Sequence, residues 1–121
     1  MPYGETVPEL MVPIFRVADG EAAAEWYERL GFTVDGVHRF APNLPRYMYL
    51  RRGDVWLHLS EHLGDARPDT LVYLYVDDVD AIADEFGVTV QTRPWTREIE
   101  LTDPDGNRVR IGTRPPGSGV R

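Results

Sequence analysis

The sequence has 121 residues, a length typical of one domain, and its 42% of hydrophobic residues suits an ordinary globular protein. It contains no cysteine, which excludes disulfide bonds, thiolate metal ligands and cysteine nucleophiles. All 13 basic residues are arginine and the net charge is −7, which argues against a nucleic-acid partner because phosphate binding needs a positive field. No apolar run approaches the ~18 residues of a membrane span and the N-terminus lacks a signal pattern, so we expect a cytoplasmic protein with no membrane partner.

The first half of the chain predicts a strand, a helix and three further strands. These elements cover residues 10–17, 21–30, 32–39, 46–51 and 55–61. Asp19 is the expected N-cap of the helix, and Gly31 supplies its C-cap. Arg52-Gly53-Asp54 is a tight turn between the last two strands. Residues 62–69, with Gly64 and Pro68, are typical of a linker.

The second half repeats the same pattern. Val17-Ala18-Asp19-Gly20 is echoed by Val76-Asp77-Asp78-Val79, and Gly31-Phe32-Thr33-Val34 by Gly87-Val88-Thr89-Val90. The predicted elements are a strand at 71–76, a helix at 79–86, and strands at 88–92, 97–101 and 108–112. The duplication predicts an α+β fold in one domain over residues 1–121. It contains two tandem βαβββ modules, about residues 10–61 and 70–112, and a flexible tail at 113–121.

Alternation along the predicted strands separates an aliphatic face from an aromatic and polar face. In residues 55–60, Val55, Leu57 and Leu59 share one face, while Trp56, His58 and Ser60 share the other. Tyr49, Tyr73, Glu98 and Glu100 fall on the corresponding non-aliphatic faces of their strands. We expect the aliphatic faces to pack against the two helices and the faces rich in Tyr and Trp to line a cleft.

The duplicated pattern, with Asp103-Pro104-Asp105-Gly106-Asn107 before the last strand, resembles the vicinal-oxygen-chelate (glyoxalase/bleomycin-resistance) superfamily. That group includes glyoxalase I, extradiol dioxygenases, fosfomycin-resistance transferases and bleomycin-resistance binding proteins. The segments Met11-Val12-Pro13, Arg29-Leu30-Gly31-Phe32, Asp69-Thr70-Leu71 and Pro94-Trp95-Thr96-Arg97-Glu98 most resemble the bleomycin-resistance branch. The resemblance covers residues 12–111 and implies a curved mixed sheet with a cleft and with the helices on its outer face.

Enzymes of this superfamily hold a divalent metal through four inward-facing positions, two in each module. The corresponding positions here are Val12, His58, Leu71 and Arg110. Two aliphatic side chains, one imidazole and one guanidinium are not a ligand set for a divalent cation. We therefore predict no metal, no cofactor and no catalytic residue.

In the bleomycin-resistance branch the ligand lies in a crevice at the interface of a two-fold dimer. The resemblance places Asp35, Phe40, Ser60, Tyr73 and Trp95 along that crevice, although tyrosine at 73 replaces a tryptophan and residues 35–40 align with a gap. Tyr49, His58 and Glu98 complete the candidate ligand-binding residues, because they share the same strand faces. The prediction is a homodimer that binds and sequesters a planar, cationic drug of the bleomycin type. A metal-dependent glyoxalase- or dioxygenase-type enzyme and a binding module for an unknown small metabolite are the alternatives.

Overall fold

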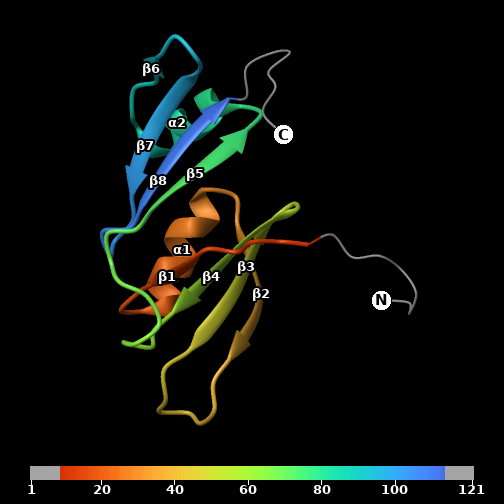
Figure 1. Cartoon of the computed structure of the whole chain (residues 1–121), viewed down its shortest axis with the longest axis vertical. Coiled ribbons are helices and arrows are strands. Elements are labelled where there is room, and N and C mark those ends of the chain that lie inside the picture. Colours follow the sequence, from red (N-terminus) through yellow and green to blue (C-terminus); the bar gives the residue numbers. More distant parts are fainter. Residues whose placement is uncertain (1–8, 114–121) are drawn as a thin grey trace, which may run out of the picture.

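The computed structural model describes residues 9–113, and Figure 1 shows their course. The first module contains β1 (Ile14–Arg16), α1 (Gly20–Arg29), β2 (Thr33–His38), β3 (Tyr47–Arg52) and β4 (Val55–Ser60). The second contains β5 (Leu71–Val76), α2 (Val79–Phe86), β6 (Gln91–Thr92), β7 (Arg97–Thr102) and β8 (Arg108–Thr113). The α+β class and the tandem βαβββ modules are therefore confirmed.

The strands form two separate four-stranded sheets, one for each module, in the orders β1-β4-β3-β2 and β5-β8-β7-β6. In each sheet the first strand of the module pairs with the last in parallel, and the remaining pairs are antiparallel. Both sheets are mixed, as predicted. The predicted curved sheet is, in hydrogen-bonding terms, two sheets placed side by side (Figure 1).

Both helices begin at an aspartate and end before a glycine with a positive φ. The Asp19 carboxylate accepts hydrogen bonds from the first backbone N–H groups of α1, and Asp78 does the same for α2. The C-cap of α1 is Leu30, one residue before the predicted cap Gly31, and Gly31 follows it with φ of 94°. Gly87 ends α2 with φ of 66°. Within residues 9–113, neither helix has the length and apolarity needed to cross a membrane.

Most element boundaries differ from the prediction by no more than one residue, and the larger differences are at the starts of β1 and β6. β1 is shorter than expected at its start because Pro13 has no backbone N–H with which to extend the ladder. β6 is shorter because the N–H of Val88 bonds to the Ala83 carbonyl at the end of α2. The predicted flexible tail starts one residue too early, since Thr113 is the last residue of β8. Residues 114–121 lie outside the described part of the chain.

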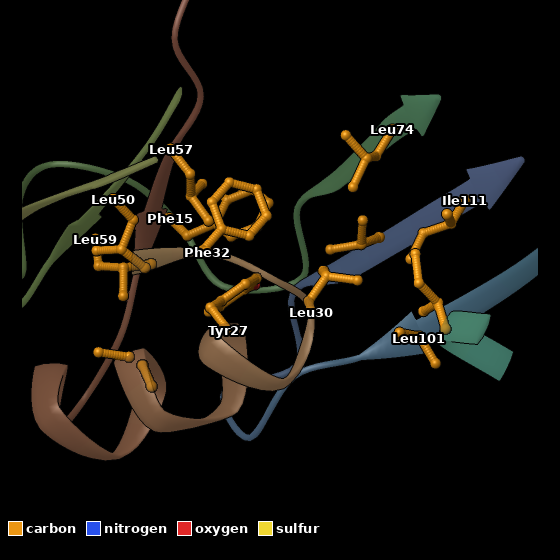
Figure 2. Packing of buried hydrophobic residues seen from close by; sticks show 14 of the residues in the cluster. Phe15, Tyr27, Leu30, Phe32, Leu50, Leu57, Leu59, Leu74, Leu101 and Ile111 are labelled. Atoms are coloured by element: carbon orange, nitrogen blue, oxygen red, sulfur yellow. The ribbon is translucent and has the colours of Figure 1, made fainter. Parts of the chain in front are cut away.

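Buried side chains from both modules form one hydrophobic core beside α1. Figure 2 shows Tyr27 of α1 and its C-cap Leu30 between a group from the first sheet, which includes Phe15, and a group from the second, which includes Ile111. The two helices also touch, because the Trp26 and Phe86 rings lie 5.2 Å apart. Each sheet therefore has one face on the core and one face turned away from its helix.

The turn between β7 and β8 connects the second module to the first. The Tyr27 hydroxyl, fully buried on α1, donates a hydrogen bond of 2.7 Å to Oδ2 of Asp103. The Asn107 side chain donates to the same oxygen at 3.2 Å and to the Arg16 carbonyl of β1 at 3.1 Å. This turn thus fixes the position of the second sheet against α1 and β1.

Candidate ligand-binding site

The second sheet presents Tyr73 on the face turned away from the helices. In the sheet register, Tyr73 on β5 lies beside Arg110 on β8, which lies beside Glu100 on β7. The Tyr73 ring crosses Gly112, where an added Cβ would collide with the tyrosine hydroxyl. This hydroxyl donates a hydrogen bond of 2.8 Å to Glu98. The missing side chain at Gly112 therefore allows Tyr73 to reach Glu98.

Glu98 and Trp95 border a hollow beside this tyrosine. The hollow has a volume of about 340 Å³ and is lined by Gln91, Arg93, Trp95, Glu98, Ile99, Glu100 and Arg110. Trp95 is 62% exposed, whereas Glu98 is only 8% exposed. Burial, followed by the hydrogen bond to Glu98, raises the pKa of Tyr73 to about 12. Tyr73 therefore remains a neutral donor at physiological pH, and the site places an exposed indole beside a buried carboxylate that is hydrogen-bonded to a partly exposed tyrosine.

The segment that carries Trp95 is fixed on both sides. Arg97 binds the Asp80 carboxylate of α2 through both terminal nitrogens, at 2.5 and 2.9 Å. The Thr96 hydroxyl donates to the Thr113 carbonyl of β8. The Trp95 backbone is thus held while its ring remains exposed, an arrangement that suits a preformed contact surface.

The carboxylates on this face are paired with arginines. Glu100 pairs with Arg110 at 3.0 Å and with Arg108 at 3.6 Å, and Glu98 lies 3.6 Å from Arg93. Each carboxylate is therefore already accompanied by at least one arginine. The aromatic rings, and not a net negative charge, are the distinctive feature of the site.

The first sheet carries a second aromatic group on its open face. The Tyr47 hydroxyl and Nδ1 of His58 are 2.8 Å apart, and the Tyr49 ring meets His58 edge-on at 4.9 Å between centroids. Burial lowers the pKa of His58, which favours the neutral imidazole at physiological pH. Ser60 follows on the same strand but is fully buried, and its hydroxyl donates to Asp65 at 2.6 Å. We therefore leave Ser60 out of the contact surface proposed below.

The other two candidate residues lie on exposed parts of the first module. Asp35 is at the irregular position of β2, where the pairing with β3 shifts between Val34 and Gly36. Phe40 is 78% exposed, and its ring meets His38 edge-on at 4.7 Å. Within residues 9–113, no hydrogen bond or ring contact joins Asp35 or Phe40 to the other candidate residues.

A hollow of about 250 Å³ between the two sheets links the modules and includes a residue that was not among the candidates. Trp56 of β4 and Tyr73 of β5 both line it, together with Met11 and core side chains such as Phe15 and Tyr27. Tyr73 thus borders this hollow, and through Glu98 it contacts the hollow beside Trp95. The alternation along the predicted strand places Trp56 on the same face as His58, and this pattern could have identified Trp56 as a candidate residue.

The structure therefore brings the candidate residues together in two groups. Tyr73, Trp95 and Glu98 form one group on the second sheet, which we call the Trp95 surface. Tyr49 and His58 form the other, on the first sheet. Among the described residues, no hydrogen bond or ring contact joins the two groups.

The donor set at the metal positions of the superfamily does not fit a divalent cation. The β1 residue that pairs with His58 is Ile14, and the β5 residue that pairs with Arg110 is Tyr73. Arg110 is bound to Glu100, and Nδ1 of His58 is engaged by Tyr47. In the described part of the chain, no group of three or more His, Asp or Glu side chains could hold a metal ion. The positions named in the sequence, Val12, His58, Leu71 and Arg110, supply one imidazole as their only suitable ligand.

Two similar mixed sheets, each with a helix on one face and aromatic side chains on the other, define a paired-module fold of the glyoxalase type. A family model described as glyoxalase superfamily protein matches residues 1–118, and the chain belongs to this superfamily. No curated protein matches the sequence.

Solved structures with the same fold include binding proteins and an oxidase. The chain is 29% identical to the bleomycin-binding protein of bleomycin-producing Streptomyces verticillus, solved with copper(II)-bleomycin, with a TM-score of 0.65 over 91% of this chain and 99% of that one. It is 26% identical to a glyoxalase/bleomycin resistance protein of a Streptomyces species, with a TM-score of 0.68 and coverage of 84% and 97%. A protein described as an oxidase is 25% identical, with a TM-score of 0.63 and coverage of 93% and 100%. The predicted superfamily is confirmed, and two of these three structures bear names of the predicted bleomycin-resistance branch.

Proposed function

We propose that the protein binds and sequesters a planar, cationic drug of the bleomycin type without the help of a metal. The observation that carries the proposal is the Trp95 surface, where an indole ring that is 62% exposed shares a hollow with Glu98, the hydrogen-bond acceptor of Tyr73. A planar ring stacked on such an aromatic gains about 0.5–1.5 kcal/mol beyond the burial of its area. A cationic group over the same ring adds about 0.5–1 kcal/mol at an exposed site.

The absence of a suitable metal-ligand set supports binding over a metal-dependent reaction. A bound drug needs only contact surface, and the Trp95 surface supplies it with backbone already held by Arg97 and Thr96. The likeness to a bleomycin-binding protein solved with copper(II)-bleomycin supports the same ligand class. Sequestration then protects the cell by lowering the concentration of free drug. This requires a dissociation constant for the drug on the order of micromolar or lower. We place this activity in the cytoplasm.

We also propose that the protein acts as a homodimer. The hollows of about 250 and 340 Å³ are at or below the small end of drug-sized sites, which span roughly 300–1,000 Å³. A second copy that laid the Tyr49–His58 group of its first sheet over the Trp95 surface would enlarge and close the site. This arrangement gives Asp35 and Phe40 a role as well, since both lie at exposed positions of the first module.

The first test is a titration of the purified full chain with metal-free bleomycin and then with copper(II)-bleomycin. Calorimetry gives the stoichiometry, and tryptophan fluorescence follows the indole directly. We expect saturable binding near one ligand per chain and a loss of at least tenfold in affinity for Trp95→Ala. Leu63→Ala is the matched control, because it removes an exposed apolar side chain outside the Trp95 surface.

The outcomes separate the parts of the proposal. No binding of either form would reject bleomycin as the ligand class. If the Trp95→Ala variant binds the drug as tightly as the unaltered chain, the binding site is not on the second sheet. Sedimentation velocity tests the dimer: a monomer at the concentration where the drug binds would show that one chain is sufficient.

A further inference from the structure

A hollow separate from the Trp95 surface lies between β1 and the linker that joins the modules. It has a volume of about 600 Å³ and is lined by Arg16, residues 63–68 and Asp105. None of these residues lines the hollow beside Trp95 or the hollow between the sheets. The linker, light green in Figure 1, runs from the end of β4 to the start of β5 and forms one wall.

The guanidinium groups of Arg16 and Arg67, which line this hollow, have no partner among the described residues. Nε of Arg16 is buried and forms no hydrogen bond. In residues 9–113, the guanidinium of neither Arg16 nor Arg67 takes part in a hydrogen bond, an ion pair or a ring contact. Their backbone carbonyls are engaged, as acceptors from the side chains of Asn107 and Thr70. Every other arginine in that part of the chain is bound to a carboxylate, a backbone carbonyl or an aromatic ring. A buried N–H without an acceptor is unfavourable, and this cost applies to Nε of Arg16. Arg67 is exposed and adds a second unpaired guanidinium at the same hollow. The two together indicate an absent anionic partner.

The carboxylates in the wall do not supply that partner. Asp65 accepts a hydrogen bond of 2.6 Å from Ser60, and Asp105 accepts one of 2.8 Å from the backbone N–H of Ala18. Neither lies within ion-pair distance of an arginine of the hollow. Their charges nevertheless set a limit on what can enter, because a dianion such as phosphate is repelled more strongly than a monoanion.

We propose that this hollow binds a small organic monocarboxylate. The guanidinium forks of Arg16 and Arg67 match the two oxygens of a carboxylate. Leu63, which is 84% exposed, and Pro68 offer apolar surface to the organic part of the ligand. This site is independent of the drug-binding function proposed above. Its ligand is an anion, whereas the proposed drug is a cation.

The test uses sodium benzoate as the probe and the full chain as the protein. Calorimetry measures affinity, and NMR of the arginine side-chain N–H groups locates the contact. We expect saturable binding that weakens at least tenfold in Arg16→Met and in Arg67→Met. Arg39→Met is the matched control, since its guanidinium binds only the Pro42 carbonyl, outside this hollow. Trp95→Ala should bind benzoate like the unaltered chain, which separates this site from the drug site.

Neutral and dianionic probes complete the test. Benzamide has the shape of benzoate without its charge and should not bind, and inorganic phosphate should bind more weakly than benzoate. The proposal is overturned by the absence of saturable benzoate binding, by equal binding in the Arg67→Met variant, or by benzamide or phosphate binding as tightly as benzoate. Because the Arg16 guanidinium has no partner, Arg16→Met should keep the thermal stability of the ligand-free protein, whereas a structural role would lower it. Arg67 is exposed, so its variant tests the site even if Arg16→Met folds poorly.

Discussion

Replacing Tyr27 by phenylalanine should destabilise the protein by removing the hydrogen bond between α1 and the β7–β8 turn. The tyrosine is fully buried and its hydroxyl donates to Asp103 at 2.7 Å. Burial, and then the nearby Asp103 charge, raise the pKa of Tyr27 far above its ordinary value, so the hydroxyl remains a donor at any working pH. The ring and its packing stay in Tyr27→Phe, and only the bond to a carboxylate is lost.

The expected cost is about 2 kcal/mol, the central value for a hydrogen bond to a charged group. For a chain of this size, such a loss lowers Tm by roughly 8 °C. Tyr49→Phe is the matched control, because in the described residues the Tyr49 hydroxyl makes no hydrogen bond and its ring is only half-buried. Urea denaturation and calorimetry of both variants measure the difference. A Tyr27→Phe variant no less stable than Tyr49→Phe would refute the view that this bond holds the modules together.

Three further predictions concern single side chains. Burial opposes the ionisation of Glu61, but Arg46 and backbone N–H groups outweigh it and lower the pKa of Glu61 to about 2, against an ordinary value of 4.5. The resulting stability is present above pH 4.5 and is lost as the pH falls toward 2, so Glu61→Gln should flatten the acid limb of a urea-denaturation series by about 3 kcal/mol. Gly112→Ala should push the Tyr73 ring aside, cost about 1–3 kcal/mol and weaken drug binding. Unchanged Tm and affinity would show that the ring turns freely. Gly31→Ala, at φ of 94°, should cost about 1–2 kcal/mol in thermal unfolding, and a neutral effect would mean that the helix end relaxes.

The elements that local chemistry determines were predicted closely. The strand at 71–76 and the helix at 79–86 have the predicted bounds because alternation and capping are properties of neighbouring residues. The aliphatic and aromatic faces were also assigned correctly, as the burial of Leu57 and Leu74 shows. These features need no knowledge of the rest of the chain.

The site was less accessible to sequence reasoning because its contacts join distant segments. Alternation placed Ser60 on an open face, but the linker folds back and Asp65 covers its hydroxyl. The pairing of Glu100 with Arg108 and Arg110 depends on the register between β7 and β8, which alternation alone does not give. The sequence alone therefore does not show that Glu100 is paired with two arginines.

The bond between Tyr27 and Asp103 also bears on how the protein is made. Seventy-six positions separate the two residues, so a ribosome that adds about 5–20 residues per second needs roughly 4–15 s to produce the acceptor after the donor. During that interval α1 lacks the second sheet that covers part of its apolar side. A chain released before residue 103 would therefore keep that side uncovered, and we expect such fragments to aggregate or be degraded instead of persisting as a folded half.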